Sequence, residues 1–362
     1  MMQAQLAEKI KHSPGGLITY ADYIAMALYT PEIGYYMREG EKIGRSGDFI
    51  TSSNVSDIYG RTLSKWYKRM VDRHGLAAQI CEVGGGNGRF AKAFLEEWYS
   101  NSGMELNYTI VETSPLHRKL QQELLSRFPG FSQPEALSAV NIHSGLLFSN
   151  ELFDALPVHV IEKQDGKLYE IMIGSKDGKL YEQQVELNNP AIDLYLERNR
   201  LTLADRQRIE IPLSMEGMVK DMAFVLGEGL VVTVDYGYTN EEWMEPGRRN
   251  GSLRGYMKHR MFDSVLEYPG EMDITTHIHL DGLVEAGNRH GLDTMAILRQ
   301  DEFLFKAGIL KELEDNYDPN PFSERSKRNR AIRSLVMPSG MSSSFHVVIQ
   351  QKGLAIKLDE LY

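Results

Sequence analysis

The segment Ile80–Phe94, ICEVGGGNGRFAKAF, decides the fold of this 362-residue chain. It begins with a short apolar run, places four glycines within five positions, and then returns to helix-forming residues. Glycine after a buried parallel strand lets the backbone turn sharply and approach a ligand without a Cβ in the way. The next helix begins beside that ligand, so its free N–H groups face it. The segment therefore predicts a strand–loop–helix unit that binds a small molecule.

The glycine spacing and two nearby acids limit the ligands that the loop could bind. The loop does not match G-x-G-x-x-G, and it lacks the lysine of a phosphate-binding loop. Glu82, two residues before the first glycine, would repel a pyrophosphate, which disfavours an NAD-dependent oxidoreductase. Glu112 ends the next strand, where an acid accepts hydrogen bonds from ribose hydroxyls. S-adenosylmethionine (SAM), which has a ribose and a sulfonium but no phosphate, fits both acids. The alternative is a turn that needs glycine only for packing.

The amino-acid composition limits the classes of protein to which this chain can belong. The chain is 42% hydrophobic and 25% charged, which is typical of a globular protein with a sizeable core. Its net charge of -10 gives no sign of a general nucleic-acid binder. The single cysteine, Cys81, excludes an internal disulfide and a four-cysteine zinc site. The first residues show no signal or transit pattern, and no apolar run is long enough to span a membrane. We therefore predict a cytoplasmic location.

The alternation of elements predicts an α/β architecture. Residues 1–75 are mostly helical, with Thr19 as a helix N-cap and a Gly- and Ser-rich loop between the helices. Strands separated by helices in 76–160 and 228–353 predict a Rossmann-like core with a parallel, doubly wound sheet. Residues 161–227 are interpreted as an insertion of β hairpins and helices for substrate or partner binding, because 158–186 contains two DGKLYE copies. The tail, 352–362, is expected to be loosely held.

Acidic residues follow a buried strand at the edge where ligands bind in parallel sheets. Asn150, Glu151 and Asp154 lie in the segment SNELFDAL. If the methyl acceptor is a guanidinium, it is cationic and unreactive, and paired carboxylates can bind its fork and orient a nitrogen. We therefore predict that Glu151 and Asp154 hold the acceptor. The alternative is that Glu151 caps the turn and Asp154 begins a helix.

A second polar group lies in DITTHIH. Alternating spacing places Asp273 and His277 on one face of a strand, where Asp273 could orient His277 as a proton acceptor or form a purely structural pair. A metal site with His279 has no further ligand-spaced support, so no metal is predicted. Arg254, Tyr256 and the basic run 258–260 form either a substrate rim or a solvated surface.

Five motifs in order, SGDFITSS, EVGGGNGRF, SNELFDALPVHV, VVTVDYGY and GSLRGYMKHR…PGEMDITTHIH, resemble those of the MidA-like SAM-dependent methyltransferases. The resemblance covers about residues 17–350. It implies a Rossmann-like SAM-dependent methyltransferase core with a helical N-terminal extension and a β-rich insertion. The family includes a mitochondrial complex I assembly factor that methylates protein arginine.

The resemblance also assigns the cofactor residues. It implies that Gly84, Gly86 and Asn87 line the amino-acid end of SAM, with Glu82 near its amino group. Glu112 would hold the ribose, and Asn150 would fix the strand end beside the cofactor. The loop that closes over SAM would contain Asp48, Phe49 and Thr51. The chain departs from the family where Gly85 replaces a common proline.

These observations predict a SAM-dependent methyltransferase that acts on a protein side chain, with arginine favoured. The resemblance suggests a respiratory-complex subunit as the substrate and allows a homodimer. No nucleic-acid partner and no membrane insertion are expected. The alternative is a non-catalytic assembly factor that keeps the fold and docks on a partner, although such a module would not need Gly84, Gly86 and Glu112.

Overall fold

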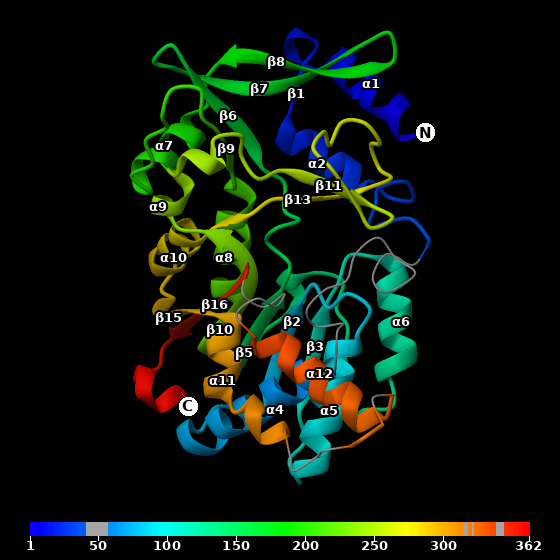
Figure 1. The fold of residues 1–362 in the computed structure, drawn as a ribbon, viewed down its shortest axis with the longest axis vertical. Helices are drawn as coiled ribbons and strands as arrows, with labels where there is room; N and C mark the ends of the chain where they lie inside the picture. The colour runs from blue at the N-terminus through cyan, green and yellow to red at the C-terminus, as the bar shows by residue number, and fades with distance from the viewer. Residues whose placement is uncertain (41–56, 314–317, 321, 338–343) are drawn as a thin grey trace. The chain divides into compact units, whose positions relative to one another are not determined.

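The computed structural model describes residues 1–40, 57–313, 318–320, 322–337 and 344–362, which form two compact units (Figure 1). The glycine-loop unit consists of Ile50–Leu152, Lys220–Tyr236 and Gly287–Tyr362. The hairpin unit consists of Met1–Phe49, Phe153–Val219 and Gly237–Ala286. The three-part domain division expected from the sequence stays a prediction. No helix in the described part of the chain is long and apolar enough to cross a bilayer.

A sheet with the strand order β15-β16-β10-β5-β2-β3-β4 forms the centre of the glycine-loop unit. The strands are β2 Gln79–Val83, β3 Asn107–Val111, β4 Phe131–Ser132, β5 Ile142–Asn150, β10 Leu226–Tyr238, β15 Asp293–Arg299 and β16 Phe345–Lys352. The run from β10 to β4 is parallel, as predicted. The sheet as a whole is mixed, because β16 runs antiparallel to both β10 and β15.

Helices and short turns complete this unit: α4 Ile58–His74, α5 Arg89–Asn101, α6 Pro115–Leu125, η2 Leu137–Ala139, α11 Gln300–Ala307, η4 Ile309–Glu312, α12 Glu324–Val336 and η6 Leu358–Leu361. Their ends follow local signals. Gly75 ends α4 in the left-handed conformation (φ 68°), and Ser114 caps α6 with Pro115 at its first position. Aromatic side chains fill the core, where Phe90 stacks on Phe148 at 4.6 Å between ring centroids.

The chain end belongs to this core, so the expectation of a loosely held tail is wrong. Leu361 is fully buried. The indole N–H of Trp66 donates to the Leu361 carbonyl at 2.7 Å, and Arg73 donates to the Tyr362 carbonyl at 3.0 Å. Both donors come from α4, which supplies hydrogen bonds and apolar surface that local sequence at residues 352–362 does not reveal.

The hairpin unit contains the antiparallel strands that the DGKLYE copies predicted. Five strands form the order β1-β7-β6-β9, with β8 on β7. They are β1 Ile18–Thr19, β6 His159–Gln164, β7 Lys167–Lys176, β8 Lys179–Glu186 and β9 Arg208–Ile211. Asp-Gly turns join β6 to β7 and β7 to β8, and all four turn residues have positive φ, as in type I′ hairpins.

Helices and a small sheet make up the rest of the hairpin unit. The helices are α1 Met2–His12, η1 Pro14–Gly16, α2 Tyr20–Tyr29, α7 Pro190–Arg198, α9 Asn240–Trp243 and η3 Pro246–Arg248, while α8 Leu213–Val225 and α10 Leu280–Arg289 contribute to both units. The strands are β11 Arg254–Met257, β12 Arg260–Phe262 and β13 Asp273–Thr275, ordered β12-β11-β13. Thr19 caps α2 by accepting from the Asp22 N–H at 3.0 Å, as predicted.

The single strand expected across DITTHIH is two strands instead. β13 ends at Thr275, and β14 (Ile278–His279) begins after a two-residue break. The break arises because the chain changes partners: β13 pairs antiparallel with β11, whereas β14 pairs parallel with the end of β10. Asp273 and His277 therefore do not share one strand face.

Candidate active site

The glycine loop joins β2 to α5 in the glycine-loop unit. Gly84 and Gly86 have φ angles of 78° and 52°, which favour glycine. The N-cap residue of α5, Gly88, has no side chain, and Asn87 Oδ1 accepts from the Arg89 N–H at 3.2 Å, so the loop leads directly into the N-terminus of a helix. Packing explains a different glycine: a Cβ on Gly85 would lie 2.6 Å from Cγ2 of Ile110. That contact disfavours any residue with a Cβ at position 85 unless Ile110 moves.

Glu112 fixes the loop from the end of β3. Its Oε2 accepts from the Gly86 N–H at 2.9 Å, and its Oε1 accepts from the Ser114 N–H at 2.8 Å. Burial raises the pKa of this carboxyl, and the backbone N–H groups oppose that rise. The N–H groups of Gly86, Ser114 and Thr113 use three of the four lone pairs of this carboxylate, and the fourth can accept a hydrogen bond from a ribose hydroxyl. Gln121, buried on α6, donates to the Gly86 carbonyl at 2.7 Å and completes the support.

Glu82 lies beneath the loop as a buried acid. It is 3% exposed, and its Oε2 accepts from the Tyr108 hydroxyl at 2.7 Å. Burial raises its pKa to about 7, with the Tyr108 hydrogen bond opposing and the Glu112 charge adding to the rise. A cationic ligand would favour the ionised form. Sequence reasoning missed Tyr108, although Ile80 of β2 pairs with it and Glu82 is two residues farther along that strand.

The end of β5 presents polar atoms that a ligand could satisfy. Within the described residues, Ser149 Oγ and Asn150 Oδ1 of β5, and Tyr59 Oη of α4, are buried without a hydrogen-bond partner. The Asn150 amide donates to Glu151 Oε1 at 3.1 Å. Glu151 has φ 52°, an uncommon conformation for a residue with a side chain that is often found at functional sites. Buried acceptors, hydroxyls and acids of this kind fit the hydroxyls and ammonium of SAM.

Asp154 and Asp273 form a buried acidic group with two tyrosines in the hairpin unit. Tyr36 donates to Asp273 Oδ1 at 2.7 Å. Burial raises the Tyr36 pKa, and the charges of Asp273 and Asp154 raise it further. The same two charges raise the Tyr256 pKa after burial, while Arg254 opposes them. The N–H of Thr276, next to β13, donates to the Asp154 carbonyl at 3.0 Å and ties the two segments together.

The alternative in which Asp154 begins a helix is wrong, because residues 151–158 contain no helix. Asp154 is instead 5% exposed and Asp273 is 3% exposed. Sequence reasoning missed Tyr36, which follows α2 in a turn and carries no local signal of a distant acid. The stacking of its ring on Tyr29 (5.6 Å between centroids) holds it in place.

His277 lies between β13 and β14, where its ring stacks on Tyr238 with 4.5 Å between centroids. Burial lowers its pKa to about 4, and the charges of Arg248 and Arg254 lower it further, so the imidazole is neutral at pH 7. Asp273 has Tyr36 as a hydrogen-bond partner, and its predicted role in orienting His277 stays a prediction. Within the described ranges no group of three His, Cys, Asp or Glu is arranged to hold a metal.

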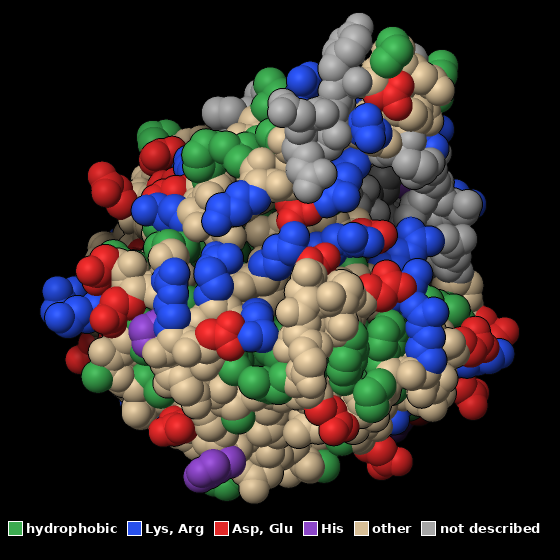
Figure 2. Space-filling model, turned by 90° about the horizontal axis from the view of Figure 1, so that it is seen from below, with side chains coloured by type: hydrophobic (Ala, Val, Ile, Leu, Met, Phe, Trp, Pro, Cys, Tyr) green, Lys and Arg blue, Asp and Glu red, His purple; other side chains and the backbone are tan. Residues whose placement is uncertain are grey.

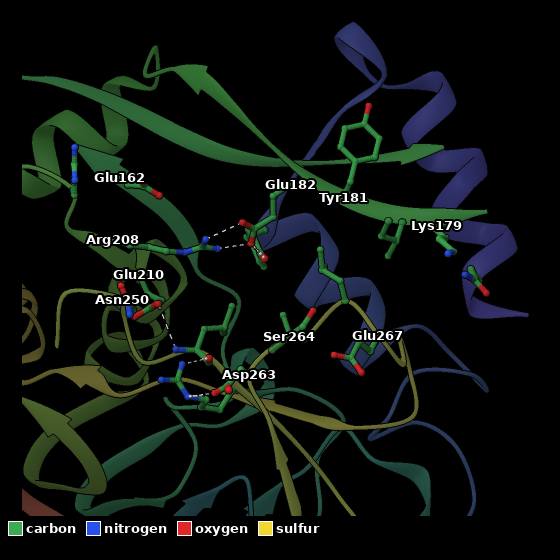
Figure 3. A pocket seen from close by; sticks show the side chains of 18 residues that line it. Glu162, Lys179, Tyr181, Glu182, Arg208, Glu210, Asn250, Asp263, Ser264 and Glu267 are labelled. Carbon is green, nitrogen blue, oxygen red and sulfur yellow. Dashed lines mark hydrogen bonds and ion pairs between the residues drawn. The ribbon is translucent and has the colours of Figure 1, made fainter. Parts of the chain in front are cut away.

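A pocket of about 970 Å³ opens in the hairpin unit (Figure 3). Arg208 of β9 donates to Glu182 of β8 with its two terminal nitrogens, at 2.8 and 2.5 Å. Arg254, expected on a rim, lines this pocket and pairs with Asp263 at 3.4 Å. In the basic run 258–260, Lys258 and His259 form the turn between β11 and β12 at positive φ, and Arg260 begins β12. Asp48, Phe49 and Thr51 lie outside the described residues.

A parallel sheet with a glycine loop after one strand and an acid after the next defines a Rossmann-like, cofactor-binding enzyme fold. The family model described as "Putative S-adenosyl-L-methionine-dependent methyltransferase" matches residues 60–298. The chain belongs to this family of SAM-dependent methyltransferases, and SAM is its cofactor. The MidA-like resemblance, the fold class and the cofactor predicted from the sequence are thereby confirmed.

Relatives and solved structures agree with this membership. The chain is 25% identical to "Protein arginine methyltransferase NDUFAF7, mitochondrial" of Danio rerio, over 91% of this chain and 82% of the relative. It is 24% identical to the Homo sapiens protein of the same name, over 95% and 82%. A COG1565 superfamily member from Burkholderia thailandensis, crystallised with S-adenosyl-homocysteine, superposes with a TM-score of 0.90 at 26% identity, covering 99% of this chain and 94% of that one.

These relatives contradict the predicted cytoplasmic location, since their names describe mitochondrial proteins. The prediction depended on the first residues lacking a transit pattern. The fold itself does not indicate the cellular compartment of a protein.

Proposed function

We propose that this chain transfers the methyl group of SAM to an arginine side chain of a protein. The observation that carries the proposal is the buried pair Asp154 and Asp273, whose charges both act on Tyr36 and Tyr256. A guanidinium presents five N–H donors in a planar fork, and two carboxylates are its natural partners. Relatives named protein arginine methyltransferases support the same acceptor at the level of the family.

In the proposed mechanism the carboxylates bind and orient the acceptor. Asp154 and Asp273 accept hydrogen bonds from the guanidinium. The Tyr36 hydroxyl donates to Asp273 Oδ1 and holds that carboxylate in position. SAM, when bound, supplies an electrophilic methyl group. The role of Glu151, which has φ 52° at the end of β5 in the glycine-loop unit, as a carboxylate that holds the acceptor stays a prediction. The nitrogen loses a proton as it is methylated, and neutral His277 is the proposed acceptor of that proton.

We assign the protein segment beside the acceptor arginine to the pocket of Figure 3. Arg254 supports this assignment, because it lines the pocket and its charge also acts on Tyr256. A respiratory-complex subunit as the substrate, and a homodimer, stay predictions from the family resemblance.

The test is transfer of labelled methyl from SAM to proteins of a heat-treated extract, followed by hydrolysis and identification of the methylated amino acid. We expect methylarginine. Asp154→Asn and Asp273→Asn should each lower transfer by about 100-fold or more, since a charge-assisted bond is worth about 1.5–3 kcal/mol and orientation is lost as well. Binding of S-adenosyl-homocysteine should stay within about twofold of wild type.

Label in another amino acid would overturn the arginine proposal. Cofactor binding without transfer to any protein would favour the non-catalytic assembly alternative. Glu123→Gln, which alters an exposed acid on α6, is the matched control and should transfer at the wild-type rate.

A further inference from the structure

The strand β8 is an edge of the sheet in the hairpin unit. It pairs with β7 along its whole length, Lys179–Glu186, and with no other strand in the described part of the chain. The two-residue turn before β8 makes Lys176 and Lys179 a hydrogen-bonded pair, so the odd-numbered residues of β8 direct their backbone groups toward β7. The backbone N–H and C=O groups of the even-numbered residues therefore point away from the sheet: Leu180, Glu182, Gln184 and Glu186.

This edge lacks the features that usually prevent strands of different molecules from pairing. β8 has eight residues, contains no proline or glycine, and pairs with β7 without a bulge. The other edge strands of the described sheets are shorter or irregular. β1 and β4 have two residues each, β12 and β13 three, β9 four, and β15 has a register shift between Thr294 and Ala296.

The exposed apolar side chains of β8 are regularly placed. Elsewhere acidic, basic and hydrophobic side chains are intermixed, as on the face shown in Figure 2. Tyr181 is 42% exposed and Val185 is 37% exposed, and their even spacing puts both on the same face of the strand. Tyr181 packs across Gly174 of β7, where a Cβ would lie 2.4 Å from the tyrosine ring. A further strand beside β8 would cover the exposed parts of both side chains.

We propose that β8 pairs antiparallel with β8 of a second copy of the chain, so that the two hairpin-unit sheets become one continuous sheet. The two-fold axis is perpendicular to the sheet and passes through Gln183, which faces Gln183 of the second copy. Tyr181 then faces Val185 of the second copy, an aromatic and β-branched pair of the kind that stabilises sheets. The even-numbered residues of the two strands form hydrogen-bonded pairs through their outward backbone groups.

The charges of β8 select this register. An axis through Glu182 would place two Glu182 carboxylates directly opposite each other, and an axis through Gln184 would oppose Glu182 to Glu186. An axis through Tyr181 or Val185 would pair a shorter part of the strand. The axis through Gln183 pairs residues 180–186 and opposes no two like charges. Because β8 complements itself in this way, a second copy fits the edge better than an unrelated strand does.

The pairing also extends the pocket of the hairpin unit. Residues 179–182 of β8 line this pocket, and Figure 3 shows Glu182 directed into it and Tyr181 directed away. A two-fold axis perpendicular to the sheet keeps even-numbered side chains on the same face in both copies. Gln184 and Glu186 of the second copy therefore continue the wall of the pocket. This inference does not depend on the proposed acceptor.

The first test is the mass of the full chain in solution, measured by sedimentation over a concentration series. We expect a dimer with a dissociation constant in the micromolar range, because a strand interface is small. Gln184→Pro removes an outward N–H and leaves the bonds to β7 in place. Each dimer then loses two hydrogen bonds, so the dissociation constant should rise at least about 30-fold. The matched control Gln184→Ala keeps the N–H and should dimerise like the wild type.

The second test is cysteine cross-linking, which reports the register. The single cysteine of the chain, Cys81, is buried and does not compete. Gln183→Cys places two thiols opposite each other with about 4.5 Å between Cα atoms, so mild oxidation should give a disulfide-linked dimer. The control Glu186→Cys places its two thiols about 20 Å apart and should give none.

Three results are incompatible with the proposal: a monomeric wild type, a dimer that Gln184→Pro leaves unchanged, or cross-linking that does not distinguish Gln183→Cys from Glu186→Cys. Titration with S-adenosyl-homocysteine confirms that each variant is folded. If Gln184→Pro does not fold, the two cysteine variants decide the question by themselves, because neither alters a backbone hydrogen bond.

Discussion

The variant Glu82→Gln tests how much the buried carboxyl group of Glu82, beside the cofactor loop, lowers the free energy of unfolding. The pKa of Glu82 is raised from an ordinary 4.5 to about 7, so the folded chain holds a proton that the unfolded chain releases in that range. The contribution of this group to stability is therefore greatest below pH 4.5, falls as the pH rises, and levels off above pH 7. Between these two pH limits the contribution of Glu82 to the free energy of unfolding falls by about 3 kcal/mol. Glutamine stays neutral, and its oxygen can still accept from Tyr108.

The cofactor-free variant should accordingly be more stable than wild type at pH 8, by up to about 3 kcal/mol, and nearly equal to it at pH 4.5. Urea unfolding at four pH values between 4.5 and 8 measures both free energies. Glu123→Gln removes an exposed carboxylate of the same unit and should leave the unfolding free energy within about 0.5 kcal/mol at each pH.

As the pH rises, the affinity of the wild type for SAM should increase while its stability falls. The ionised carboxylate favours a cationic ligand, so wild-type affinity should rise between pH 5.5 and 7.5, and Glu82→Gln should bind SAM about 10- to 100-fold more weakly. Isothermal titration at these pH values gives the affinities. A variant that is no more stable at pH 8 and binds SAM as tightly as wild type would refute the reasoning.

Three further variants test other parts of the fold. Gly85→Ala places a methyl group against Ile110 and should lower the unfolding free energy by about 1–3 kcal/mol, measured by urea unfolding; an unchanged value would contradict the packing explanation. Leu361→Ala removes a buried side chain at the end bound by Trp66 and should cost about 2–4 kcal/mol, whereas a tail that melts independently would show no loss. Glu112→Ala removes two hydrogen bonds to the loop and should weaken S-adenosyl-homocysteine binding by about 100-fold in calorimetry; equal affinity would refute the assignment.

Local signals explain what could be predicted from the sequence. The strand before the glycine loop, the Asp-Gly hairpins and the cap of α2 each depend on residues that are neighbours in the chain. The cofactor could be predicted for the same reason, because Glu82, the glycines and Glu112 fall within one strand–helix–strand unit.

Contacts between distant residues explain what could not be predicted. Tyr36 and Asp273 are 237 residues apart, and neither has a neighbour that signals the other. The antiparallel return of β16 and the break between β13 and β14 depend on which strand each segment meets, which an alternating apolar pattern does not specify.

The hydrogen bond between Trp66 and Leu361 has a consequence for how the chain is made. It joins residues separated by 295 positions, and the strand β16 between β10 and β15 is likewise supplied by the last 20 residues. During synthesis the glycine loop and the strands beside it leave the ribosome long before the segments that cover them. The cofactor-binding unit must therefore wait, with apolar strand edges and α4 uncovered, until residues 345–362 have left the ribosome. During that interval it is most vulnerable to aggregation and most dependent on chaperones.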